Sequence, residues 1–127
     1  MHLIDTSVWI DFLRGSTTSK VSFLEQLLTD GEAALCEVTY SEICFGAKDQ
    51  KQLLKYSKYF GAIPFLSLPL EWHHQAADIG WQIRSKGQKP YLADLMIALT
   101  ALTHQVPLLT NDKDFEIYQK LFELQLI

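Results

Sequence analysis

The fold class that the sequence predicts is α/β, with helices on both faces of a central parallel sheet of four to five strands. Short apolar runs alternate along the chain with longer segments whose apolar residues recur at helical spacing. Such runs are typical of strands that are covered on both faces of their sheet. The 127 residues, 48% of them apolar, are enough for one core, and neither a repeat nor a flexible linker interrupts them. We therefore expect a single domain over residues 1–127.

The first half of the chain predicts two strands and four helices. Met1 to Asp5 is a short apolar run that ends in a carboxylate and predicts the first strand, and Ala33 to Val38 predicts the second. Helices are predicted over four segments: Thr6 to Arg14, Thr18 to Thr29, Thr39 to Gly46 and Lys48 to Phe60.

The second half predicts further strands and two long helices. Ile63 to Leu68 is apolar but contains a proline, which favours a strand at the edge of the sheet. Leu70 to Lys86 and Tyr91 to His104 predict helices, the second of them the most apolar in the chain. The remaining predicted elements are a strand at Pro107 to Leu109, a helical segment from Asn111 through Leu121 and a short final strand at Leu124 to Ile127.

Composition excludes several functional classes. The net charge of −4 does not suit a protein that holds nucleic acid by bulk positive charge, so any such contact needs a local basic patch or metal ions. No apolar run reaches the roughly 18 residues of a membrane span, and no secretory leader is visible at the N-terminus. Cys36 and Cys44 suggest no disulfide framework. We expect a cytoplasmic protein without a membrane partner.

Acidic residues fall where parallel sheets form their sites. Asp5 ends the first predicted strand and Asp112 follows the strand at Pro107 to Leu109, so both belong at the carboxyl edge of the sheet. Glu42 lies in the helix after the second strand, Asp94 in the first turn of the apolar helix, and Asp114 just beyond Asp112. Their positions predict that these carboxylates converge.

Each of these residues also has an ordinary structural explanation. Asp5 could cap the helix that begins at Thr6, and Asp112 could cap the turn that follows it. Thr39 and Glu42 have the spacing of a capping box, and Asp94 would be favourable near the positive end of its helix. Taken singly, the capping explanations are at least as good as a functional one.

Asp94 is the hardest of them to explain by capping. Nine of the eleven residues from Leu92 to Leu102 are apolar, which predicts a buried helix, and burying a carboxylate is costly unless a cation pairs with it. Several converging carboxylates would repel one another without a cation. Oxygen ligands suit Mg²⁺ or Mn²⁺, and carboxylate-bound ions of this kind hydrolyse phosphodiesters through metal-activated water.

Four motifs carry a resemblance to a known family. They are Leu3 to Gly15, Thr39 to Ile43 around Glu42, Asp94 to Ala98, and Leu108 to Phe115. In this order they resemble the motifs of PIN-domain ribonucleases, and most closely those of the VapC toxins of type II toxin–antitoxin systems. The motifs extend over nearly the whole chain.

The resemblance implies an α/β/α sandwich and a Mg²⁺- or Mn²⁺-dependent endoribonuclease that acts on tRNA or another structured RNA. It implies Asp5, Glu42, Asp94 and Asp112 as the catalytic and metal-binding quartet, with Asp114 as an auxiliary ligand. Small hydroxyl residues would support the metal site: Thr6, Ser7 and Thr110. The implied partners are an RNA substrate, a cognate VapB-like antitoxin protein, and a second copy of the chain in a homodimer or a hetero-oligomer with the antitoxin.

Two groups of basic residues are candidates for RNA contact. Arg84, Lys86 and Lys89 precede Asp94 closely in the sequence, which favours contact with the RNA backbone. Lys51 and Lys55 belong to a stripe of lysines at helical spacing. A stripe of this kind is also typical of a solvated helix face.

Other functions remain to be weighed against the ribonuclease. A phosphoacceptor signalling domain would need an aspartate at the third strand, and Ile63 to Leu68 has none. A dehalogenase-type phosphatase would need Asp-x-Asp at the first strand, where the chain has Asp5-Thr6-Ser7. A catalytically inactive PIN-like or metal-binding regulatory module, acting through protein–protein binding, is the alternative that keeps the same fold.

Overall fold

A computed structural model describes all residues from Met1 to Ile127. Its sheet has three parallel strands in the order β2-β1-β3, with β1 at His2–Ile4, β2 at Ala33–Ala34 and β3 at Leu108–Leu109. The first strand is therefore central, and its carboxyl end lies between the ends of the other two. The predicted α/β class and parallel sheet are present, but the predicted count of four to five strands is not confirmed.

The two outer segments that were predicted as strands form single bridges instead. Phe65 pairs with Leu35 beside β2, and Leu126 pairs with Leu108 beside β3, both in parallel orientation. In the first, the Leu35 N–H donates to the carbonyl of Pro64 at 2.9 Å. Pro64 has no N–H of its own, so it cannot contribute a donor to a longer ladder. Both segments lie beside the sheet, but the predicted strand lengths are too long.

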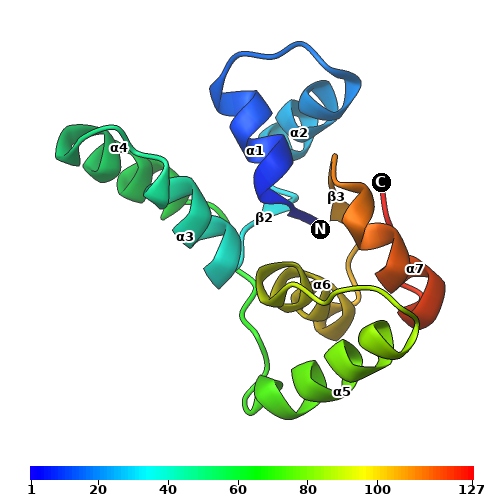
Figure 1. Ribbon diagram of the computed structural model, residues 1–127. Helices are drawn as coiled ribbons and strands as arrows, with labels where there is room; N and C mark the ends of the chain where they lie inside the picture. Colours follow the sequence, from blue (N-terminus) through cyan, green and yellow to red (C-terminus); the bar gives the residue numbers. More distant parts are fainter.

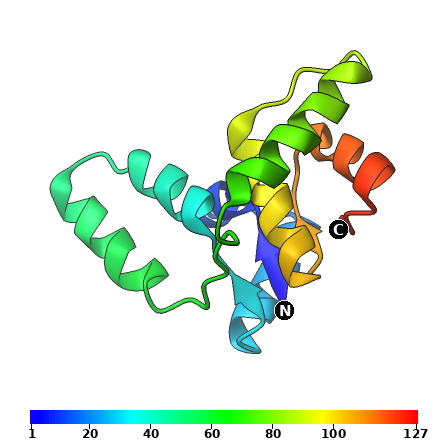
Figure 2. The same ribbon diagram turned by 90° about the horizontal axis from the view of Figure 1, so that it is seen from below.

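Helices make up most of the rest of the chain, and Figures 1 and 2 show them arranged around the short sheet. The helices are α1 (Thr6–Leu13), α2 (Ser19–Thr29), α3 (Glu37–Phe45), α4 (Gln50–Phe60), α5 (Trp72–Ser85), α6 (Leu92–His104), the 3₁₀ helix η1 (Lys113–Phe115) and α7 (Glu116–Phe122). In both views α3 and α4 project from the body as an antiparallel pair. No helix is long and apolar enough to cross a membrane.

The strands β1 and β3 each send neighbouring side chains into two separate cores. Leu3 and Leu108 join a cluster with residues of α5, α6 and α7, whereas Ile4 and Leu109 join a cluster with residues of α1 and α2. All four of these side chains are completely buried. Because successive residues of a strand point to opposite faces, a sheet covered on both sides needs consecutive apolar residues. This explains why the strands appear in the sequence as unbroken apolar runs.

The second predicted strand and the helix after it meet at a different residue from the one expected. The sequence predicts a strand to Val38 and a helix from Thr39, but α3 begins at Glu37 with Cys36 as its N-cap. Thr39 reaches back to this cap, where its Oγ1 accepts from the Cys36 N–H at 3.0 Å. The predicted capping box between Thr39 and Glu42 is therefore wrong, and the Glu42 side chain is available for another contact.

Candidate metal centre

Asp5 leaves the central strand and begins α1. It is 5% exposed and is the N-cap of the helix, so the capping explanation of this residue is confirmed. Its Oδ2 accepts from the Ser7 hydroxyl at 2.6 Å, the Thr110 hydroxyl at 2.8 Å and the Ser7 N–H at 3.4 Å. All three contacts are to one oxygen, so Oδ1 has no hydrogen-bond donor within the chain. These contacts thus occupy Oδ2, and Oδ1 is left without a hydrogen bond.

Glu42 is held by a hydroxyl from α1. The Thr6 hydroxyl donates to Glu42 Oε1 at 2.7 Å, across 36 positions of sequence. Thr6 is buried and follows Asp5 directly. This hydrogen bond therefore connects Glu42, on α3, to the carboxyl end of β1. The three small hydroxyl residues named from the sequence, Thr6, Ser7 and Thr110, therefore each orient a carboxylate.

Asp94 lies in the first turn of α6, half-buried, with its carboxylate facing other acids. The pKa of Asp94 is raised from 3.8 to about 6, chiefly because burial removes water from the charged form. The negative charges of Asp112, Asp5, Asp114 and Glu42 raise it further, in that order. The other four predicted acidic residues thus lie close enough to Asp94 for their charges to raise its pKa.

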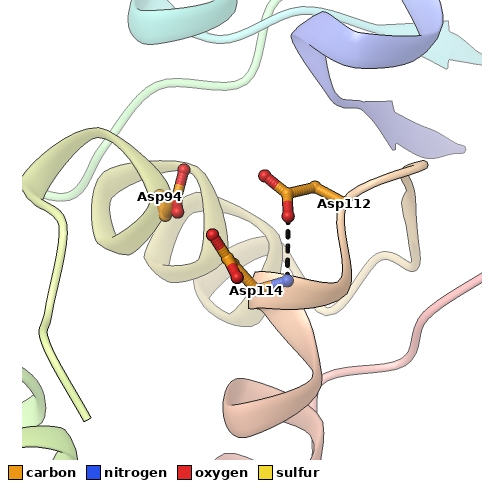
Figure 3. A group of neighbouring side chains, drawn as sticks. All are labelled: Asp94, Asp112 and Asp114. Carbon is orange, nitrogen blue, oxygen red and sulfur yellow. Dashed lines mark hydrogen bonds between the residues drawn. The ribbon is translucent and has the colours of Figure 1, made fainter.

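Asp112 and Asp114 lie on the turn that follows β3. Asp112 is the N-cap of η1, and its Oδ1 accepts from the Asp114 N–H at 2.9 Å, as Figure 3 shows. The Asp112 N–H in turn donates to Thr110 Oγ1 at 2.9 Å. Since that hydroxyl also donates to Asp5, Thr110 connects the ends of β1 and β3. The turn thereby aims both aspartates toward α6.

Asp94, Asp112 and Asp114 form the tightest group of acids in the molecule. One carboxylate oxygen of each lies within 4.8 Å of the others, and Figure 3 shows the side chains turned toward a common space between α6 and η1. Asp5 and Glu42 are outside this group. Asp114, named from the sequence as auxiliary, is inside it. We call these three residues the acidic triplet.

No cation of the protein forms an ion pair with the acidic triplet. The one ion pair in the structure joins the Met1 amino group to Glu32, at 2.8 Å. Lys20, on α2, donates its ammonium to the Thr110 carbonyl oxygen and not to a carboxylate. An all-oxygen site with excess negative charge and no internal counter-ion fits a hard divalent cation such as Mg²⁺ or Mn²⁺.

The basic residues named from the sequence lie in two places. Lys89 lines a cavity of about 210 Å³ together with Asp94 and Asp114. Arg84 and Lys89 line a second cavity beside it, and Lys86 is the exposed C-cap of α5. Lys51 and Lys55 are exposed on α4, which projects away from α6 in both ribbon views. The structure thus puts Lys89 beside the acidic triplet, Arg84 in the neighbouring cavity, and the second group on a separate arm.

Two residues beside the site escaped the sequence analysis. The Lys20 ammonium contacts the Thr110 carbonyl oxygen, 90 residues away in the sequence, and no local pattern predicts such a contact. Tyr118 lines the same cavity as Asp94 and Asp114 and is 2% exposed. Its pKa is raised well above the ordinary value by burial and by the charge of Asp94, so it remains a protonated donor. Tyr118 follows Asp114 by four positions in a helical segment, a spacing that could have revealed it.

Comparisons with known proteins identify the family of the chain. The PIN-domain family profile matches residues 2–121. Ribonuclease VapC11 of Mycobacterium tuberculosis is 28% identical over 129 residues, covering 98% of this chain and 96% of the relative. Ribonuclease VapC19 of the same species is 26% identical over 122 residues, covering 95% and 97%.

A solved structure shows the same fold at low identity. The structure of VapBC2 from Rickettsia felis, bound to a DNA fragment from its promoter, superimposes with a TM-score of 0.79 at 18% identity, covering 99% of this chain and 96% of that one. The family profile matches almost the whole chain, and the matched region contains all five acidic residues. This chain therefore belongs to the PIN-domain family.

Proposed function

We propose that this protein is the RNA-cleaving toxin of a VapBC-type toxin–antitoxin pair and acts as a metal-dependent endoribonuclease. The observation that carries the proposal is the acidic triplet, whose oxygens gather within 4.8 Å without a protein cation. Ribonucleases named VapC among its relatives support the choice of RNA. The hydroxyl contacts to Asp5 and Glu42 support a site with a defined geometry.

The residues that would hold Mg²⁺ or Mn²⁺ are the acidic triplet, with Asp5 and Glu42 beside it. A bound divalent ion would neutralise phosphate charge and make water nucleophilic at neutral pH. The chain's own part is to fix the carboxylates: Thr110 and Ser7 hold one oxygen of Asp5, and Thr6 holds one oxygen of Glu42. Their remaining oxygens are left for contacts from outside the protein.

The chain would hold RNA by local charge rather than by net charge. Lys89 lines the cavity that contains Asp94 and Asp114, and Arg84 lines the cavity next to it, which supports contact of both side chains with RNA phosphates. Lys51 and Lys55 lie further out, on α4, where they could reach a distant part of a structured RNA such as tRNA. The first group should therefore affect binding more than the second.

The antitoxin would cover the other side of the site. Ile10, Leu13 and Ile43, with Glu42 and Tyr56, line a cavity of about 220 Å³ between α1, α3 and α4. On the same two helices, α3 and α4, Phe45 is 83% exposed and Leu54 is 66% exposed, which is unusual for side chains of this size. The sequence predicts antitoxin contacts on the helices around Val8 to Leu28 and Tyr40 to Phe60. An apolar antitoxin segment in this cavity would reach Glu42 directly.

Cleavage of a structured RNA by the purified chain tests the proposal. We expect cleavage with Mn²⁺ or Mg²⁺, no cleavage in EDTA, and products with a 5′-phosphate and a 3′-hydroxyl. Asp94→Asn is the inactive variant, and Asp30→Asn, an exposed residue at the end of α2, is the matched control. Cleavage that persists in EDTA, or products with a 2′,3′-cyclic phosphate, would contradict the proposed mechanism. A chain that binds an antitoxin but never cleaves RNA would favour the inactive regulatory module.

A further inference from the structure

A lysine of α2 contacts the turn that carries Asp112. The Lys20 ammonium donates to the carbonyl oxygen of Thr110, the residue that follows β3. The same side chain lines a cavity of about 410 Å³ together with Thr110, Asn111 and Asp112. Thr110 is 4% exposed and Lys20 is half-buried, so the contact lies at the edge of the core and not on the open surface.

The peptide unit between Thr110 and Asn111 is held at both of its polar atoms. Its carbonyl oxygen accepts from Lys20, on α2, and its N–H donates to the Ser7 hydroxyl, on α1, at 3.1 Å. Because a peptide unit is planar, contacts to both atoms fix the orientation of the whole plane. The next N–H, of Asp112, donates to Thr110 Oγ1 at 2.9 Å. The plane that Lys20 contacts therefore sets the direction in which the chain enters Asp112.

The position of Lys20 is unfavourable for α2 itself. Lys20 is the second residue of the helix, at the end where the helix dipole favours negative charge and disfavours a cation. The first turn of α2 contains no acidic residue, and the ion pair of the structure joins other groups. Local helix stability therefore does not explain a lysine at this position, whereas the contact with Thr110 does.

From these observations we infer that Lys20 is a positioning residue of the candidate metal centre, which holds Asp112 in place through the Thr110 peptide. The effect on cleavage rests on the proposed ribonuclease function, whereas the contact itself needs neither RNA nor metal. Asp112 needs such support because its carboxylate lies beside those of Asp94 and Asp114, and like charges repel one another. Lys20 acts through the backbone and not as a counter-ion, since it donates to a carbonyl oxygen.

Amide hydrogen exchange of the metal-free protein, measured for each residue by NMR, tests the positioning role without RNA. Lys20→Met removes the ammonium but keeps most of the stem, and it should speed exchange of the Asn111 and Asp112 N–H groups by about tenfold. Lys20→Arg keeps a charged donor and should restore slow exchange. Lys120→Met, the same substitution at an exposed lysine of α7, is the matched control and should leave exchange at the turn unchanged. The unfolding temperature of Lys20→Met should change little, because an unfavourable charge leaves the start of α2 as the contact is lost.

Cleavage kinetics separate this inference from the proposed function. Lys20→Met should lower kcat for RNA cleavage by about tenfold and leave KM nearly unchanged, because Lys20 acts on Asp112 and not on the substrate. A raised KM with unchanged kcat would make Lys20 an RNA contact and overturn the inference. Unchanged exchange at Asn111 and Asp112, or faster exchange throughout the chain, would overturn it as well. If the wild type cleaved no RNA but Lys20→Met still sped exchange at these two N–H groups alone, the positioning role would stand and the ribonuclease would be refuted.

Discussion

The two sides of the candidate metal centre are built on opposite principles. On one side, Asp5 and Glu42 are fixed by hydroxyl donors from Ser7, Thr110 and Thr6. On the other side, Asp94 and its neighbours of the acidic triplet face one another, and the single internal contact is from the Asp114 N–H to Asp112. The first side is complete within the folded chain. The second has an excess of negative charge for which the folded chain supplies no ion pair.

This difference implies that the two sides contribute differently to stability and to activity. Hydrogen bonds to a carboxylate favour its charged form, whereas burial beside like charges opposes it. Removing a charge from the fixed side should therefore cost stability, and removing one from the acidic triplet should increase it. Activity should need both sides. Each of the following experiments uses this contrast.

The largest expected effect is on catalysis, where the two sides should not differ. Asp5→Asn, Glu42→Gln, Asp94→Asn and Asp112→Asn should each lower the rate of RNA cleavage by about 1000-fold or more. Double variants should lose little further activity, because the residues act as one unit. The measurement is the initial rate with Mn²⁺ under single-turnover conditions. Additive losses across the two sides would mean that they work independently.

A smaller effect is expected from loosening the fixed side without changing its charge. Thr6→Val removes the hydroxyl that orients Glu42, and loss of such a contact typically lowers activity by about 10- to 100-fold. Thr100→Val is the matched control, since the Thr100 hydroxyl is buried but donates only to the Met96 carbonyl within α6. An equal loss of cleavage in both variants would show that packing, and not the contact to Glu42, is responsible.

Removing a charge should change the stability of the protein in opposite directions on the two sides. The raised pKa of Asp94 means that the folded state holds its proton more tightly, so its stabilising contribution is present at low pH and is lost as pH rises from about 4 to about 6. Without metal, Asp94→Asn should therefore be more stable than the wild type near neutral pH, by about 1–2 kcal/mol after allowance for solvent screening. Urea unfolding at several pH values measures this difference.

Asp5→Asn is the contrasting variant in the same unfolding series. Its side chain keeps the capping geometry but weakens three hydrogen bonds to a charged oxygen, so we expect a small loss of stability. If both variants stabilised the protein equally, the hydroxyl contacts to Asp5 would not compensate its charge, and the contrast between the two sides would disappear.

The smallest expected effects concern RNA affinity. Lys89→Ala should weaken binding several-fold and lower the slope of log affinity against log salt by about one unit. Lys51→Ala, on the projecting α4, should change both quantities less. Binding of an RNA to the inactive Glu42→Gln variant at several salt concentrations measures both effects. If Lys51→Ala weakened RNA binding more than Lys89→Ala, the RNA would bind along α3 and α4 instead.

The sequence predicted the fold class and the parallel sheet, because consecutive apolar residues and helical spacing are local signals. It overestimated strand lengths at Ile63 to Leu68 and Leu124 to Ile127, where pairing depends on the partner segment and not on local residues. It also misplaced the start of α3, since a cysteine is an unusual N-cap.

For the site, motif order placed five acids near one sheet edge, and in the structure the charges of the other four raise the pKa of Asp94. What the sequence did not indicate is which acids gather most closely. That grouping depends on the turn from Thr110 to Asp114, whose hydrogen bonds to Asp5 and within η1 form only in the folded chain. Contacts such as Lys20 with Thr110 are likewise invisible until distant segments meet.

Cation binding to the acidic triplet is the most direct test of the central claim. Calorimetric titration of the RNA-free protein with Mn²⁺ should show binding near neutral pH, and binding should weaken below about pH 6 as Asp94 takes up its proton. The double variant Asp94→Asn/Asp112→Asn should lose it, while Asp30→Asn should retain it. Wild-type affinity in the double variant, or no binding by the wild type, would contradict a metal centre at this position.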